Sequence, residues 1–166
     1  MIIFESVYFT VTAHHKPHID RSEGGHIKIA PKERVRDRQS LAPEQAIELM
    51  RLTIVTGEAM TRVLRRNGID IGRINYQDNG NWSVFAPEGP YLHIHLYGRA
   101  KDARKQPYGQ ACFFPHMDER PEFYEDLEPL SEEDCSGIRA EIERLLAEEV
   151  YSDARWGLEL RYDEPR

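Results

Sequence analysis

The chain has 166 residues, enough for one domain or for one domain with an appendage. A formal net charge of -7 argues against broad nucleic-acid binding but allows a small nucleotide in a locally basic pocket. No apolar run approaches the roughly 20 residues of a membrane span, and Glu5 ends the short apolar start too early for a signal peptide. The two cysteines, Cys112 and Cys135, lie far apart and suggest a reducing compartment, so we expect a cytoplasmic protein.

Two strands and a histidine-containing loop are predicted near the N-terminus. Residues 7–12 are rich in β-branched and aromatic side chains, and residues 26–30 alternate between polar and apolar, so both should be strands and should pair antiparallel. Residues 14–22 between them form a polar loop with three histidines, His14, His15 and His18. A metal site and solvated or phosphate-facing side chains are both open interpretations of this loop.

A long helix is predicted over residues 43–67, where Pro43 suits the first position and Asn67-Gly68 makes a stop. Its packing face is predicted to be apolar, with Ile47, Met50, Ile54, Val63 and Leu64. Gly57 lies inside the helix and suggests a close approach by another element. A strand over residues 69–75, a turn at 77–81 and an insertion at 82–89 should follow. Near the C-terminus, Ser131 should cap an amphipathic helix whose apolar stripe is Ile138, Ile142, Leu145, Leu146 and Val150.

Residues 90–99 form the most informative stretch of the chain. Tyr91, His93, His95 and Tyr97 alternate with Leu92, Ile94 and Leu96, which is the period of a β-strand with one apolar face and one face of rings. Three interpretations are open for the paired histidines. They could be ordinary side chains of a half-exposed strand, ligands of one metal ion, or a nucleophile and a charge-neutralising partner for chemistry at phosphorus.

The same stretch resembles the signature of the histidine triad (HIT) family, in which three histidines alternate with hydrophobic residues and Pro or Gly and then Arg often follow. Tyr91 takes the place of the first histidine, His93 of the second and His95 of the third, and Gly98-Arg99 takes the place of the trailing pair. Residues 24–32 resemble the family's Gly-His-x-Leu-Val-Ile-Pro-Lys strand, although Arg34 stands where many members have a second histidine. Residues 41–50 and 74–81 resemble the helix start and the turn before the triad.

The resemblance implies an α+β fold, with an antiparallel sheet of about five strands and a long helix packed on it. It covers about residues 1–105. We therefore expect a HIT-like catalytic domain over residues 1–110 and a C-terminal extension over residues 111–166, with an acidic connector and an amphipathic helix, packed on the same domain or on a dimer partner. It also implies a homodimer that acts on a small-molecule nucleotide, with no membrane or nucleic-acid partner.

The activity implied by the resemblance is hydrolysis or transfer of a nucleotidyl group. The substrates would be nucleoside polyphosphates of the diadenosine polyphosphate type or nucleoside phosphoramidates, through a covalent nucleotidyl-histidine intermediate. A noncatalytic nucleotide-binding module is the alternative, and a metal-dependent hydrolase is the third reading. No metal site and no tightly bound cofactor are expected, although Mg²⁺ could accompany the substrate phosphates.

The resemblance also assigns the site residues. The catalytic set is His93 as the nucleophile, with His95 and Tyr91; a phenol does not take up a proton near neutral pH, so Tyr91 leaves any acid role of a first histidine unfilled. The substrate-binding set is His26, Asn75, Asn81 and Arg99. Asp20 is a candidate for contact with the ribose.

Overall fold

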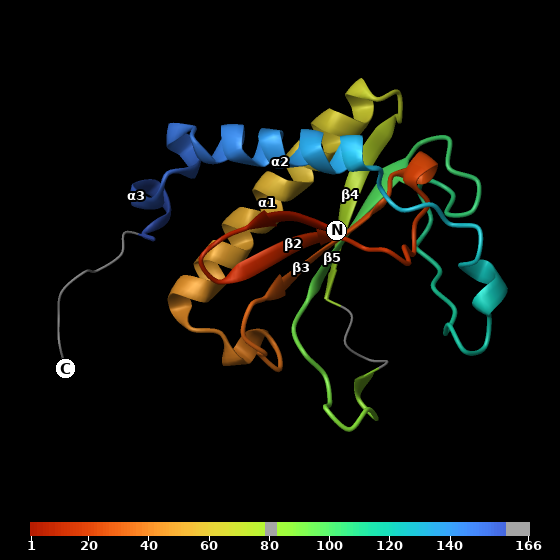
Figure 1. The fold of residues 1–166 in the computed structure, drawn as a ribbon, viewed down its shortest axis with the longest axis horizontal. Coiled ribbons are helices and arrows are strands. Elements are labelled where there is room, and N and C mark those ends of the chain that lie inside the picture. Colours follow the sequence, from red (N-terminus) through yellow and green to blue (C-terminus); the bar gives the residue numbers. More distant parts are fainter. Residues whose placement is uncertain (79–82, 159–166) are drawn as a thin grey trace.

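The computed structural model describes residues 1–78 and 83–158 as a five-stranded antiparallel sheet with helices on one face (Figure 1). The strand order is β1-β2-β3-β5-β4, which leaves β1 and β4 as the edges. The strands and the α-helices are β1 (Ile2–Glu5), β2 (Phe9–Ala13), β3 (His26–Pro31), α1 (Pro43–Arg66), β4 (Ile71–Asp78), β5 (Ile94–Ala100), α2 (Glu132–Leu146) and α3 (Asp153–Trp156). This confirms the predicted α+β class. The strand expected at 7–12 is the second one, because Ile2–Glu5 adds an edge strand before it.

Helix α1 has the predicted bounds to within one residue but only part of the predicted face, since Val63 and Leu64 are buried. Met50 and Ile54 are 54% and 38% exposed, so assigning them to the core was wrong. The buried stripe instead consists of Leu49, Leu52, Val55, Ala59, Met60, Val63 and Leu64. A stripe that starts at Leu49 keeps the helical spacing of three or four residues down to Val63, whereas Met50 and Ile54 lie on the neighbouring face.

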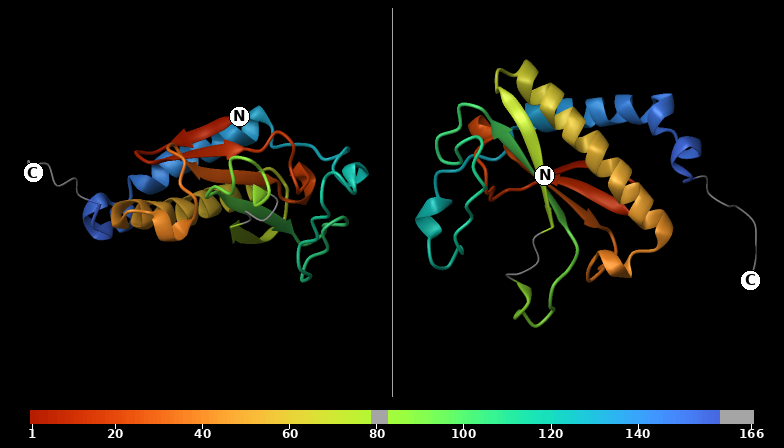
Figure 2. Two further views of the ribbon diagram at one scale, coloured as in Figure 1. Left: turned by 90° about the horizontal axis from the view of Figure 1, so that it is seen from below. Right: turned by 180° about the vertical axis from the view of Figure 1, so that it is seen from behind.

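Helix α2 begins with the predicted cap, since Ser131 Oγ accepts a hydrogen bond from the Asp134 backbone N–H and Asp134 Oδ2 accepts one from the Ser131 N–H. Ile138, Ile142 and Leu145 are fully buried, and α2 crosses α1 (Figure 2). Arg62 of α1 donates a hydrogen bond to Glu141 of α2 over 3.0 Å. The extension therefore packs on this same chain, while the division of the chain at residue 110 stays a prediction. None of the helices in the described ranges is long and apolar enough to cross a membrane.

Strand β5 lies between β3 and β4 and is buried on both faces. Leu92, Ile94 and Leu96 face the helix-side core, as the alternation predicts. The interpretation of this stretch as a half-exposed strand was wrong. The segment after β5 covers the ring face of the sheet, where Phe114 lies over Tyr97. The strand also begins at Ile94, so Tyr91 and His93 belong to the extended segment that leads into it.

Gly98 has a steric role in this arrangement. A Cβ atom on Gly98 would lie 2.1 Å from the backbone oxygen of Gly24, so only glycine lets β5 pass the turn before β3. The Gly98 N–H donates to the Gly25 oxygen over 3.1 Å at this crossing. The close approach fixes β3 against β5 and thereby the register of their polar side chains.

Candidate functional site

A cluster of imidazole and phenol rings covers the sheet face opposite the helices. The antiparallel register of β3 and β5 pairs Lys28 with His95 and His26 with Tyr97, so the side chains of all four project from the same face. His18, from the loop between β2 and β3, lies against this layer with its ring centre 4.8 Å from that of His26. The structure therefore brings together histidines from three separate segments.

Three of these histidines form a hydrogen-bonded chain with one direction. The His18 backbone N–H donates to His26 Nδ1 over 3.2 Å, so this nitrogen carries a lone pair. Neutral His26 then carries its proton on Nε2, which lies 2.7 Å from His95 Nδ1 and donates to it. His95 Nδ1 is an acceptor as well, so the proton of neutral His95 is on Nε2. His95 thus presents an N–H donor to the site.

His93 has the opposite tautomer. Its Nδ1 lies 2.9 Å from the backbone oxygen of Tyr91, and a carbonyl only accepts, so Nδ1 carries the proton. The lone pair of a neutral His93 is therefore on Nε2. The His93 ring meets that of His95 edge-on, with the centres 4.6 Å apart. One strand segment thus presents a nucleophilic nitrogen and a donor nitrogen side by side.

Burial keeps these rings uncharged. Desolvation lowers the pKa of His95 to about 2 and that of His18 to about 4. The pKa of His26, which is 1% exposed, lies well below the usual range for the same reason. Desolvation also lowers the pKa of His93, although the hydrogen bond to the Tyr91 carbonyl opposes this effect. His93 is consequently neutral at pH 7, which is the state that a nucleophile needs.

Tyr91 packs on the nucleophile candidate through its ring. The centres of the Tyr91 and His93 rings are 4.5 Å apart and the planes are inclined by 29°. The Arg34 guanidinium lies 5.1 Å from the centre of the Tyr91 ring and donates hydrogen bonds to the Glu88 and Gly89 oxygens. Arg34 and Tyr91 thus border the site on the side of His93.

Two predicted substrate-binding residues make their contacts within the protein. Arg99 is 4% exposed and donates to the Cys112 Sγ, 2.9 Å away, and to backbone oxygens of residues 106, 107 and 110. Asn75 Nδ2 lies 3.7 Å from the same sulfur. Both side chains thus hold the segment that follows β5. Asn81 lies outside the described residues.

Asp20 also serves the structure of the loops. Its carboxylate accepts hydrogen bonds from Ser22 and, over 2.7 Å, from the Glu128 backbone N–H. It thereby ties the loop after β2 to the connector before α2, and contact with a ribose stays a prediction. Figure 1 shows the two segments side by side.

Sequence reasoning left the contributions of His18, Tyr97, Phe114 and Tyr124 unassigned. His18 Nδ1 lies 2.8 Å from the Tyr97 hydroxyl, and the rings of Phe114 and Tyr124 lie within 5.6 Å of His18. Tyr97 could have been found, because it shares the parity of His93 and His95. The other three come from loops whose position depends on tertiary contacts.

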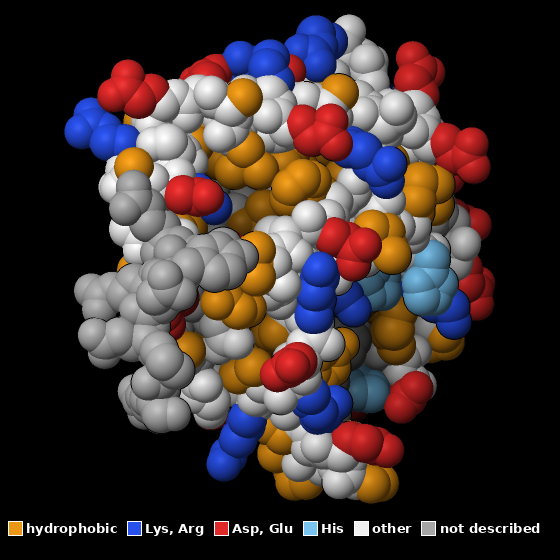
Figure 3. All heavy atoms as spheres, turned by 60° about the vertical axis from the view of Figure 1, so that its left-hand side comes forward, with side chains coloured by type: hydrophobic (Ala, Val, Ile, Leu, Met, Phe, Trp, Pro, Cys, Tyr) orange, Lys and Arg blue, Asp and Glu red, His pale blue; other side chains and the backbone are white. Residues whose placement is uncertain are grey.

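Within residues 1–78 and 83–158, lysine and arginine side chains lie at the border of this cluster. On the face shown in Figure 3, histidine side chains reach the surface beside lysine and arginine side chains. In these ranges no three His, Cys, Asp or Glu side chains are arranged to hold one metal ion. The cluster as described is a set of neutral rings bordered by cations and by the Asp78 carboxylate, which pairs with Arg38.

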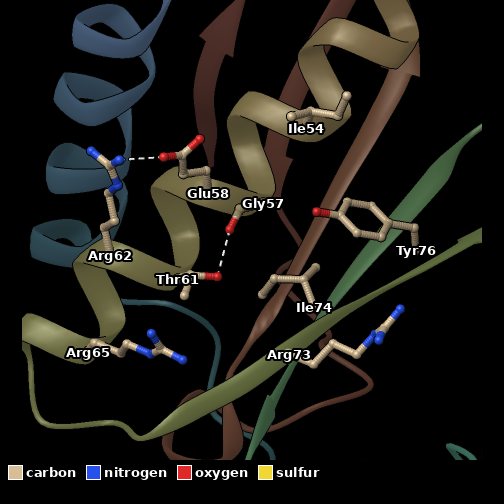
Figure 4. Close-up of a pocket in the computed structure, with 9 residues that line it drawn as sticks. All are labelled: Ile54, Gly57, Glu58, Thr61, Arg62, Arg65, Arg73, Ile74 and Tyr76. Atoms are coloured by element: carbon tan, nitrogen blue, oxygen red, sulfur yellow. Dashed lines mark hydrogen bonds and ion pairs between the residues drawn. The ribbon is translucent and has the colours of Figure 1, made fainter.

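A separate pocket of about 520 Å³ lies between α1 and β4 (Figure 4). Tyr76 and Ile74 line it together with Gly57, Glu58 and Arg73. Tyr76 pairs with Leu96 in the sheet, so the pocket is on the helix side and excludes the histidines. Gly57 allows this contact, since a Cβ there would be 2.0 Å from the Tyr76 hydroxyl, which confirms that the glycine marks a close approach.

No protein-family model and no curated protein matches the sequence. Solved structures do match. A histidine triad protein from Marinobacter aquaeolei VT8 has a TM-score of 0.56 at 19% identity, with 88% of each chain covered. A hypothetical histidine triad nucleotide-binding protein from Sulfolobus tokodaii has a TM-score of 0.55 at 16% identity, covering 87% of this chain and 85% of that one. A Zn-bound histidine triad family protein from Mycobacterium smegmatis has a TM-score of 0.52 at 20% identity, covering 87% and 84%. The chain therefore has the fold of the histidine triad proteins.

Proposed function

We propose that the chain is a nucleotidyl hydrolase or transferase that uses His93 as its nucleophile. The observation that carries this proposal is the pair of opposite tautomers on neighbouring neutral rings, a lone pair on His93 Nε2 and an N–H on His95 Nε2. Chemistry at phosphorus needs both groups, one to attack and one to offset charge on the phosphoryl oxygens. The fold and the sequence resemblance point to a nucleotide as the substrate.

The reaction would proceed in two displacements. His93 Nε2 attacks the α-phosphorus, the bond from phosphorus to the bridging atom breaks, and its electron pair leaves with the leaving group. The Tyr91 carbonyl keeps its hydrogen bond to Nδ1–H and stabilises the positive charge that the ring acquires. Water or an alcohol then attacks the phosphorus, the P–N bond breaks, and the proton of the acceptor passes to solvent. The imidazole recovers its lone pair.

His95 would act as a donor rather than as a base. Its Nε2–H can bond to a non-bridging oxygen of the phosphoryl group, and the donation from His26 holds this polarity before substrate binds. The unfavourable protonation of His95 rules it out as a proton acceptor near neutral pH. No step needs a bound metal ion, although Mg²⁺ could accompany substrate phosphates.

The test is trapping of the intermediate. Protein mixed with a nucleoside polyphosphate and quenched in alkali, where phosphorus–nitrogen bonds survive, should carry one nucleotidyl group on His93 by mass spectrometry. His93→Ala should carry none, while nucleotide binding stays within about tenfold, and His15→Ala is the matched exposed-histidine control. Binding without a trapped intermediate or turnover in the wild type would support the noncatalytic module instead. Loss of turnover after exhaustive chelation would support the metal-dependent hydrolase.

We also propose that two copies associate through the α1–β4 face. Strand β4 is a sheet edge, and Met50, Ile54 and Tyr76 are large apolar side chains left exposed beside it. A second copy could continue the sheet and cover these residues. Sedimentation should give a dimer for the wild type and a monomer for Ile54→Glu, with Ile2→Glu on β1, the opposite edge of the sheet, as control. A monomeric wild type would refute the association.

A further inference from the structure

The ammonium of Lys28 lies on the ring face of the sheet, beside the proposed nucleophile. Lys28 pairs with His95 in the β3–β5 register, yet its Nζ is 5.9 Å from the centre of the Tyr91 ring, four residues earlier in the chain. The lysine side chain therefore runs along β5 from the level of His95 past that of His93. Its charge is among the causes that lower the pKa of His93.

This ammonium has no anionic partner among the described residues, in contrast to other lysines. Lys101 binds Asp70 over 3.0 Å, and Lys32 lies 3.9 Å from Glu5. Lys28 is half-buried and faces neutral imidazoles, which offer it no negative charge. An uncompensated cation in such a place is stabilised when an anionic ligand arrives.

A second cation lies at the same end of the site. The backbone oxygens of Glu88 and Gly89 hold Arg34 over the Tyr91 ring, with hydrogen bonds of 2.8 and 2.6 Å. A phenol at this position is a much weaker acid than an imidazolium. The end of the site occupied by Tyr91 therefore offers two cations and only weakly acidic groups.

We propose that Lys28 binds the leaving group and that the site selects phosphate chains over amines as leaving groups. This inference rests on the proposed function. When His93 Nε2 forms its bond to the α-phosphorus, the bond from that phosphorus to the bridging oxygen breaks. The electron pair stays on the departing phosphate, whose new charge Lys28 neutralises without proton transfer. An amine leaving group must instead take up a proton as its bond to phosphorus breaks, and the described residues at the Tyr91 end offer only weak acids for this, a phenol and an ammonium.

The experiment compares three adenosine substrates with the full-length chain. These are diadenosine tetraphosphate, adenosine 5′-phosphoramidate, and the p-nitrophenyl ester of AMP, whose leaving group needs neither a proton nor a polyphosphate site. The variants are Lys28→Met and Lys28→Arg, with Lys32→Met as the control from the end of the same strand. The readout is kcat/KM for each substrate, with trapping of the adenylyl group on His93.

Lys28→Met should lower kcat/KM for the tetraphosphate by about 10²-fold and change it for the aryl ester by less than about threefold. Lys28→Arg should recover most of the loss, Lys32→Met should behave as the wild type, and the wild type should be slowest on the phosphoramidate. Equal losses on the tetraphosphate and the aryl ester, or no loss, would overturn the role of Lys28. A phosphoramidate turned over as fast as the tetraphosphate would overturn the selectivity. Failure of the wild type to adenylate His93 even with the aryl ester would overturn the proposed function itself, and this inference with it.

Discussion

Replacement of His26 tests the hydrogen-bonded chain that sets the tautomer of His95. In His26→Leu, His95 Nδ1 loses the donor that now lies 2.7 Å away, in a place where His95 is 4% exposed. A buried acceptor left without a donor costs about 1–3 kcal/mol, and the leucine side chain recovers part of this by apolar contact. We expect a net loss of about 1–2 kcal/mol in the free energy of unfolding.

The loss of activity should be larger than the loss of stability can explain. Removing a preorganised donor at a reacting oxygen typically costs about 10²–10³ in kcat. Since His95 stays in place and loses only its fixed polarity, we expect kcat to fall by about 10- to 100-fold in His26→Leu. His26→Gln can still donate an amide N–H to His95 and should stay within about fivefold of the wild type. His15→Leu, an exposed histidine of the neighbouring loop, is the control.

The measurement pairs kinetics with nitrogen NMR of the histidine rings. In the wild type, His95 should carry its proton on Nε2 and His93 on Nδ1. The preference of the His95 proton for Nε2 should weaken in His26→Leu but not in His26→Gln. A proton on His95 Nδ1 in the wild type would refute the chain of donors. Full activity of His26→Leu would show that the tautomer of His95 has no catalytic consequence.

Four further predictions concern pH, stacking and the helix packing. Because burial lowers the pKa of His93 below 6.5, kcat/KM should stay level above pH 6.5 and fall only at lower pH. The depressed pKa values of His26 and His95 mean that the unfolded chain binds more protons below pH 6.5, so the urea midpoint should drop from pH 6.5 to pH 5; a constant midpoint would contradict this. Tyr91→Phe should change kcat by less than about threefold and Tyr91→Ala should lower it by about 3- to 10-fold, since the ring contact with His93 is worth about 0.5–1.5 kcal/mol. Gly57→Ala should destabilise by about 1 kcal/mol because its Cβ meets the Tyr76 hydroxyl, but should stabilise by a similar amount in a Tyr76→Ala background, as chemical denaturation of both pairs would show.

Local signals accounted for most of the fold. The alternation in residues 90–99, Pro43 at the start of α1 and Ser131 at the start of α2 each follow from the backbone's own requirements. Both helices begin where their signals lie, and β5 forms within its stretch but begins only at Ile94. Met50 and Ile54 were wrongly assigned to the buried face of α1 because they are as apolar as the buried Leu49, whereas Val63 and Leu64 were assigned correctly. Hydrophobicity alone does not say which of two adjacent stripes meets the sheet.

The site was predictable only where it follows one strand. Parity placed Tyr91, His93 and His95 on one face, and the resemblance added His26 from β3. The carbonyl that orients His93 is its own neighbour at Tyr91, which the sequence could not name because several backbone conformations leave that oxygen out of reach. Arg99 shows the opposite problem. It lies at the expected position in β5, but its guanidinium donates hydrogen bonds to the loop at 106–110.

The direction of the hydrogen bonds explains why the loop at 14–22 matters to the chemistry. Every link donates the same way, from the His18 N–H to His26 and from His26 to His95. This series of hydrogen bonds begins at a backbone N–H, which can only donate. The position of one loop peptide therefore determines which nitrogen of His95 holds the proton. Moving that peptide by an ångström would free His26 to adopt either tautomer, and His95 would lose its defined polarity. A loop far from His95 in sequence therefore sets the polarity of the His95 ring. Under the proposed mechanism, substitutions that shift residues 16–19 should impair kcat without any contact with substrate.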